Sequence, residues 1–241
     1  MKKILPIVFV LALAQWWFTD SSIRVQSNDV SFSYIVKYSG GSGRGDALPL
    51  LVALHGNGDT ADNFYDTALD QFNIPARIIL IQGPIPYGRG NAWPWSPDDF
   101  KQYGTAVTET VDALSLKYPT LGKPILFGFS GGGMMAYYQA LKHGNRYSYI
   151  FPVSGQLSKN LLGDEVFNVG AQVIAFHGLN DSIVSISGGR KAVNLLRENG
   201  ADVSISEFKG GHQGIFTVMK SKITETIEEK IASLNTAQNT F

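Results

Sequence analysis

The sequence predicts an α/β fold, with a mostly parallel central sheet, an antiparallel hairpin at its N-terminal end and helices on both faces. Short, nearly continuous apolar runs recur from Pro49 onward, and such runs are typical of strands that are covered on both faces. Longer segments with helical character separate these runs, whereas the first part of the chain alternates polar and apolar residues. Repeating strand–helix units of this kind place a sheet between two layers of helices.

The expected elements follow one another without an internal repeat or linker. Alternating residues 23–26 and 30–38 flank a Ser27-Asn28-Asp29 turn and predict the opening hairpin. The connection between Gly155 and Gly170 is too short for a helical cap domain, so we expect an open cleft. The other expected strands are residues 50–54, 77–81, 124–129, 149–153, 173–176 and, near an edge, 203–208. The expected helices are residues 60–72, 100–118, 132–143, 188–199 and 215–234.

Length and composition narrow the class of protein. The chain has 241 residues, of which 44% are hydrophobic and 17% charged, and this favours one folded domain, expected over residues 20–241. The formal net charge is zero, so no basic excess is available to bind nucleic acid. The chain has no cysteine, which excludes disulfides, thiolate metal sites and a cysteine nucleophile.

The first residues are typical of a secretory signal peptide. A basic start at Lys2-Lys3 precedes an apolar run from Ile4 to Ala14 that ends in small residues. We expect a signal peptide over residues 1–14, cleaved as late as residue 20, and an exported protein, periplasmic or secreted, with no stable membrane partner afterwards. The alternative is an uncleaved anchor extended by Gln15-Trp16-Trp17-Phe18, although the apolar stretch is shorter than the roughly 20 residues of a spanning helix.

Ser130 is the candidate nucleophile. Gly128-Phe129-Ser130-Gly131-Gly132 matches the G-x-S-x-G nucleophile elbow, directly after an expected strand and before an expected helix. The glycines are needed because the helix folds back on the strand and side chains two residues either side of the serine would collide. The alternative is an ordinary glycine-rich turn between a strand and a helix.

An acid and a histidine follow at the ends of two later strands. Asp181 is placed to hydrogen-bond a catalytic histidine, although an Asn-Asp-Ser sequence is also a common turn. His212 lies among glycines, where it is either a general base or an exposed loop residue. Serine, acid and histidine in this chain order are expected of the α/β-hydrolase fold and not of other serine-hydrolase arrangements.

A second glycine-rich loop, which begins at His55, follows the strand expected at residues 50–54. Acyl transfer requires two backbone N–H groups aimed at the oxyanion of the tetrahedral intermediate. We expect the N–H of Gly131, directly after the serine, and that of Asn57 to supply them. Asp59 and Thr60 are better placed to cap the following helix.

These motifs together resemble the phospholipase/carboxylesterase branch of the α/β-hydrolases, which includes acyl-protein thioesterases. The resemblance implies a lidless, cofactor-free esterase or thioesterase and places an aromatic residue, Trp93, beside the acyl pocket; the alternative is that Trp93 packs under its own loop. Family members often have glutamine at the position of Gly131 and leucine at that of Asn57, but backbone donors survive both changes. The likeness rests on Leu54-His55-Gly56-x-Gly58-Asp59, Gly128-Phe129-Ser130-x-Gly132-Gly133, His177-Gly178-x-x-Asp181-x-x-Val184 and Gly211-His212.

The leading hypothesis is a serine hydrolase that cleaves small-molecule carboxylic esters with a small or short-to-medium acyl chain, without metal or cofactor. A thioesterase or phospholipase-type acyl hydrolase would use the same triad. A metal-dependent hydrolase is an alternative from another class, because nitrogen and oxygen ligands are available. The third alternative is a binding protein that has lost turnover. The candidate metal ligands are His55, Asp59, His177, Asp181 and His212.

Overall fold

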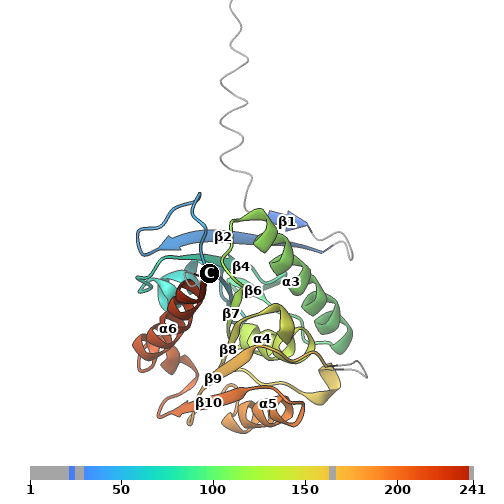
Figure 1. Ribbon diagram of the computed structural model, residues 1–241. Coiled ribbons are helices and arrows are strands. Elements are labelled where there is room, and N and C mark those ends of the chain that lie inside the picture. Colours follow the sequence, from blue (N-terminus) through green and yellow to red (C-terminus); the bar gives the residue numbers. More distant parts are fainter. Residues whose placement is uncertain (1–21, 25–29, 163–166, 239–241) are drawn as a thin grey trace, which may run out of the picture.

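The computed structural model describes residues 22–24, 30–162 and 167–238 (Figure 1). The expected signal peptide, residues 1–14, and the expected turn at residues 27–29 lie outside the described residues.

An eight-stranded sheet forms the centre of the molecule, in the order β1-β2-β4-β3-β7-β8-β9-β10. The pairs β1–β2 and β2–β4 are antiparallel, and every other neighbouring pair is parallel. This is the mixed sheet that the sequence predicts. The strands are β1 (Ser22–Arg24), β2 (Ser31–Ser39), β3 (Leu50–Leu54), β4 (Ala76–Ile81), β7 (Ile125–Phe129), β8 (Tyr149–Val153), β9 (Gln172–Gly178) and β10 (Val203–Phe208).

The central strands are buried throughout because the apolar faces of helices cover both faces of the sheet. In β3, Leu50, Val52 and Leu54 point into one core, and Leu51 and Ala53 point into the other. The first core is closed by α3 (Pro97–Lys117), α4 (Gly131–Lys142) and α5 (Ile186–Glu198). The second is closed by α2 (Ala61–Phe64), the π-helical turn η2 (Tyr65–Leu69) and α6 (Lys220–Gln238). Figure 1 shows α6 on the opposite side of the sheet from α3 and α4.

Strand register brings the loops of the site together. Leu54 pairs with Gly128 and Phe129 with Val153, so β3, β7 and β8 end at nearly the same level. Phe208 pairs with Gly178, so β9 and β10 also end together. Side chains just past these carboxyl ends therefore gather at one edge of the parallel sheet.

Two departures from the sequence-based expectation lie near the carboxyl edge of the sheet. A two-stranded hairpin, β5 (Ile85–Tyr87) and β6 (Gly90–Ala92), was not expected. Gly88 in its turn has a φ of 62°, which favours glycine. The last helix begins at Lys220 and not at residue 215, because the chain first makes the 3-10 turn η5 (His212–Phe216). The Gly214 carbonyl then accepts hydrogen bonds from the N–H groups of residues 217–219.

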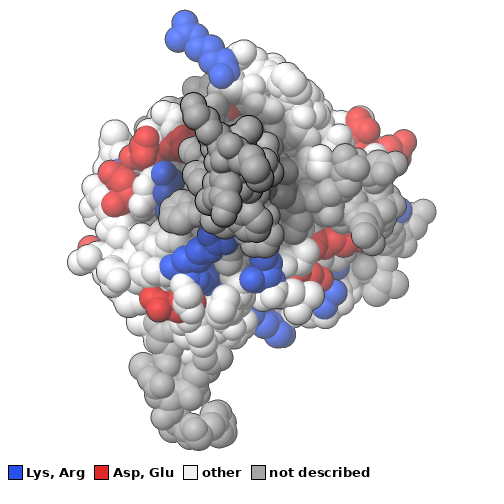
Figure 2. Space-filling model, turned by 90° about the horizontal axis from the view of Figure 1, so that it is seen from above, with Lys and Arg blue, Asp and Glu red and all other residues white. Residues whose placement is uncertain are grey.

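The surface in Figure 2 carries Lys and Arg side chains beside Asp and Glu side chains. In the part of the chain that the structure describes, no helix has the length and apolar character needed to span a membrane.

Candidate active site

Four loops at the carboxyl edge of the sheet contribute to one site. Asn57 follows β3, Ser130 follows β7, Asp181 follows β9 and His212 follows β10. The structure thus brings together residues that lie up to 155 positions apart along the chain.

Ser130 occupies a strained backbone conformation at the turn from β7 into α4, with φ 54° and ψ −112°. The flanking glycines are required by close packing. A Cβ at Gly128 would collide with the Gly132 carbonyl, and one at Gly132 would collide with the Leu54 carbonyl. A Cβ at Gly133 would lie 2.6 Å from the Val153 carbonyl oxygen. The glycines therefore allow the tight turn that places the serine side chain at its tip.

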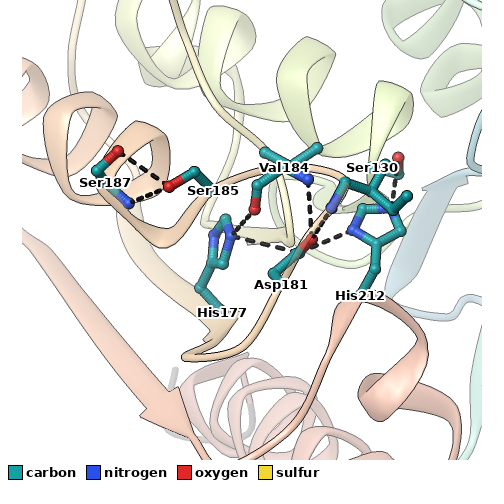
Figure 3. Close-up of polar contacts among 8 residues, drawn as sticks. Ser130, His177, Asp181, Val184, Ser185, Ser187 and His212 are labelled. Atoms are coloured by element: carbon teal, nitrogen blue, oxygen red, sulfur yellow. Dashed lines mark hydrogen bonds and ion pairs between the residues drawn. The ribbon is translucent and has the colours of Figure 1, made fainter.

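Ser130, His212 and Asp181 are joined by two short hydrogen bonds (Figure 3). The Ser130 hydroxyl donates to His212 Nε2 at 2.9 Å, and His212 Nδ1 donates to Asp181 Oδ2 at 2.7 Å. Both the imidazole and the carboxylate are buried. This arrangement provides a path for a proton from the hydroxyl to the imidazole and holds the imidazole in one tautomer.

The Asp181 carboxylate is oriented by its own loop. Its Oδ1 accepts hydrogen bonds from the N–H groups of Ile183 at 3.0 Å and Val184 at 2.8 Å. This leaves Oδ2 facing His212, and His177 Nε2 lies 3.4 Å from the same oxygen. The Asn180-Asp181-Ser182 segment thus forms a turn and also presents a carboxylate, so the two interpretations of this sequence are compatible.

Asn57 and Gly131 line the same cavity as Ser130. Gly131 is the first residue of α4, where N–H groups have no partner within the helix. Among the residues that the structure describes, no backbone carbonyl accepts a hydrogen bond from the N–H group of Asn57 or of Gly131. Both donors remain available to a ligand.

The carbonyl of His55 ties the two donor loops together. It accepts a hydrogen bond from the Gly132 N–H at 3.2 Å and another from the Trp93 indole Nε1 at 2.8 Å. The loop after β3 and the start of α4 are therefore fixed relative to each other without a bound substrate.

A cavity of about 660 Å³ opens over Ser130. One part of its wall is apolar and the other is polar. Ile183, Tyr87 and Trp95 remain at least half exposed, and the Tyr87 and Trp95 rings meet edge to face at 5.5 Å between centroids. The apolar lining comprises Tyr87, Trp95, Phe129, Met134, Ile183, Val184 and Phe216, and the polar lining includes Asp59, Asn63, Thr67 and Gln213.

Comparison with known proteins identifies the family. The model of a family described as Phospholipase/Carboxylesterase matches residues 41–231. The chain belongs to the phospholipase/carboxylesterase family. As a member, it is a serine ester hydrolase of the carboxylesterase and thioesterase type, and its sheet and helices are those of the α/β-hydrolase fold that the sequence predicts.

Solved structures of similar fold carry related names. Esterase PE8 has a TM-score of 0.67 at 21% identity, over 82% of this chain and 98% of that chain. The Bacillus cereus carboxylesterase has a TM-score of 0.66 at 16% identity, over 82% of this chain and 94% of that chain. Zea mays acyl-protein thioesterase 2 has a TM-score of 0.62 at 21% identity, over 82% of this chain and 98% of that chain. At these identities the likeness concerns the fold alone. A search of curated proteins finds no significant match.

His55 has a structural position in this family member. Its Nδ1 donates to the Gly56 carbonyl at 2.6 Å, and its Nε2 accepts from the Gly83 N–H at 2.8 Å. Burial lowers the pKa of His55 because a charged imidazole would lose its hydration, so the ring stays neutral and holds the loop. Both nitrogens that a metal ion would need are occupied. Among the described residues, no three His, Cys, Asp or Glu side chains are placed to hold a metal ion.

Trp93 does not lie beside the acyl pocket, and this corrects the expectation drawn from the family resemblance. Its side chain is 1% exposed, packs in the core against Phe32 and is absent from the cavity wall. The alternative, packing beneath its own loop, describes it better. Trp95, two residues later, is 52% exposed and lines the cavity. The unexpected β5–β6 hairpin brings Tyr87 beside it. A Gly88-Arg89 turn between Tyr87 and Trp95 is the sequence signal of the hairpin that brings the two aromatic residues together.

The two tryptophans should respond differently to truncation. Trp93→Ala is expected to lower the free energy of unfolding by about 3–5 kcal/mol, because it empties a filled core site. Trp95→Ala is expected to change stability by less than about 0.5 kcal/mol, but to raise KM several-fold for esters with larger apolar groups. Thermal unfolding and kinetics on acetyl and octanoyl p-nitrophenyl esters measure the two effects. Equal destabilisation by both changes would contradict this assignment.

Proposed function

We propose that the protein hydrolyses carboxylic esters through an acyl-enzyme on Ser130, with His212 as general base and Asp181 as the group that orients it. The observation that carries this proposal is the position of the His212 ring, 2.9 Å from the serine hydroxyl and 2.7 Å from the carboxylate. The strained turn that exposes Ser130 and the two unengaged N–H groups at the same cavity support it.

The reaction takes place in two steps. The Ser130 oxygen attacks the ester carbonyl while its proton passes to His212 Nε2, and the N–H groups of Asn57 and Gly131 stabilise the oxyanion. The intermediate collapses, and His212 returns the proton to the departing alcohol. A water molecule then gives a proton to His212 and attacks the acyl-enzyme, which releases the carboxylic acid and restores the serine hydroxyl. Asp181 stabilises the imidazolium in both steps.

The size and lining of the cavity support the proposal that the substrates are esters with a small or short-to-medium acyl chain. Its apolar wall, which includes Trp95, Ile183 and Phe216, suits a hydrocarbon group, and its volume of about 660 Å³ is in the range of small-molecule sites. The described residues that connect β8 and β9, 154–162 and 167–171, contain only the 3-10 turn η4 (Lys159–Leu161) and form no helical cap over the site.

Covalent labelling tests the proposed nucleophile. A fluorophosphonate probe should label the wild-type protein at Ser130, since the hydroxyl is exposed to the cavity and hydrogen-bonded to a base, and Ser130→Ala should not react. Ser154→Ala is the matched control, because Ser154 also has a positive φ but its side chain is fully buried. Labelling that persists in Ser130→Ala, or ester turnover that a chelator abolishes while the probe fails to react, would favour a different hydrolase mechanism.

A further inference from the structure

The side chains at positions 57 and 131 share one space. A Cβ added at Gly131 would collide with Asn57 Oδ1 and would lie 2.7 Å from Asn57 Cγ and 3.0 Å from Asn57 Nδ2. The carboxamide of Asn57 therefore packs directly over the Cα of Gly131, where any larger residue would project. By the family resemblance, leucine and glutamine are often found at these two positions, and in this structure the two positions are in contact.

The orientation of the Asn57 amide is fixed by the neighbouring loop. Its Oδ1 accepts a hydrogen bond from the Trp93 backbone N–H at 2.9 Å. Since an N–H group can only face the oxygen of a carboxamide, this contact assigns Oδ1 and directs Nδ2 elsewhere. Trp93 is itself held by the hydrogen bond from its indole to the His55 carbonyl, so the amide is positioned before substrate binds.

Among the described residues, the Asn57 side chain is hydrogen-bonded through Oδ1 to the Trp93 N–H, and Nδ2 is left unengaged. The residue is partly exposed and lines the cavity together with Ser130, Gly131 and His212. An oriented donor thus lies next to Gly131, in the wall of the cavity that the carbonyl group of an ester must enter for attack by Ser130.

We propose that the side-chain amide of Asn57 donates a third hydrogen bond to the oxyanion, in addition to the backbone N–H groups of Asn57 and Gly131. This inference rests on the proposed function of Ser130. The amide stabilises negative charge that develops only as the hydroxyl attacks, so it raises kcat and has little effect on KM. Gly131 is the residue that leaves room for it.

The test separates donation to the oxyanion from support of the Trp93 loop. Asn57→Asp keeps an oxygen that accepts the Trp93 N–H but has no N–H to donate, whereas Asn57→Ala removes both. We expect both variants to lose about 100-fold in kcat on p-nitrophenyl butyrate with KM within a few-fold of wild type. A trifluoromethyl ketone, which forms an anionic adduct with the serine, should lose affinity by a similar factor in both. Thr67→Asp places the same negative charge elsewhere in the wall of this cavity. Its rate loss, which we expect to be smaller, measures the electrostatic effect of the added charge alone.

A double-mutant cycle adds a second test. Gly131→Ala should displace the Asn57 amide and lower kcat, while adding Gly131→Ala to Asn57→Ala should cost little further rate, because the displaced group is already absent. Wild-type kcat and inhibitor affinity in Asn57→Asp, losses equalled by Thr67→Asp, or additive losses in the double variant would each overturn the inference. None of these results would affect the assignment of Ser130, which labelling and Ser130→Ala test separately.

Discussion

Ser130→Ala is expected to lower kcat by about 10⁴- to 10⁶-fold and to leave the fold intact. Among the described residues, the hydroxyl hydrogen-bonds to His212 Nε2, so its removal leaves the glycine packing of the turn unchanged. Alanine has the same backbone restriction as serine at a φ of 54° and adds no strain. Turnover of p-nitrophenyl butyrate and thermal unfolding of wild type and variant measure the two outcomes.

The same experiment extends to His212→Ala and to the double variant. Serine and histidine act on one proton, so the double variant should be no slower than either single variant. Additive losses would show that the two residues act independently, which is incompatible with the shared hydrogen bond. Unchanged turnover in Ser130→Ala would contradict the proposed mechanism as a whole.

Asp181→Asn is expected to lower kcat by about 10⁴-fold, through the tautomer of His212. The Ile183 and Val184 N–H groups require an oxygen at the Oδ1 position. The amide nitrogen of the variant must then occupy the Oδ2 position and donate toward His212 Nδ1. The imidazole responds by carrying its proton on Nε2, where it cannot accept the proton of Ser130.

Comparison with Asp181→Ala isolates this effect. Alanine leaves the ring free to adopt either tautomer, so we expect Asp181→Ala to be no slower than Asp181→Asn although it removes more atoms. Steady-state kinetics measure the rates, and ¹⁵N chemical shifts of the labelled His212 ring report the tautomer directly. A wild-type Nδ1–H tautomer in Asp181→Asn, or a small rate loss, would argue against an orienting role for the carboxylate.

The arrangement of the sheet followed from apolar runs because both faces of each parallel strand are buried. Leu50–Leu54 and Ala76–Ile81 are buried at every position, so continuous hydrophobicity was a direct signal of a central strand. The candidate serine directly follows such a run, and the candidate acid and histidine lie three and four residues past the ends of β9 and β10. Once parallel strands are assigned, their carboxyl ends must meet at one edge.

The cavity wall was harder to predict. Trp93 and Trp95 are separated by one residue, and the local sequence does not indicate that the first enters the core while the second lines the cavity. The decision depends on the register of the β5–β6 hairpin and on the His55 carbonyl that receives the Trp93 indole. The start of α6 was missed because glycines at 210, 211 and 214 allow the 3-10 turn to precede the helix.

The separation between Trp93 and Trp95 bears on how this enzyme can be altered. The loop that carries Asn57 is held in the interior by the hydrogen bond from the Trp93 indole to the His55 carbonyl. Tyr87, by contrast, belongs to the β5–β6 hairpin and meets Trp95 at the surface. Side-chain changes at Tyr87 and Trp95 can therefore redirect which esters are accepted. The backbone of β6 must be kept, because Asn91 exchanges hydrogen bonds with Gly58 and Asp59 in the loop that carries Asn57. Directed libraries restricted to Tyr87, Trp95 and Ile183 are the natural starting point for such redesign.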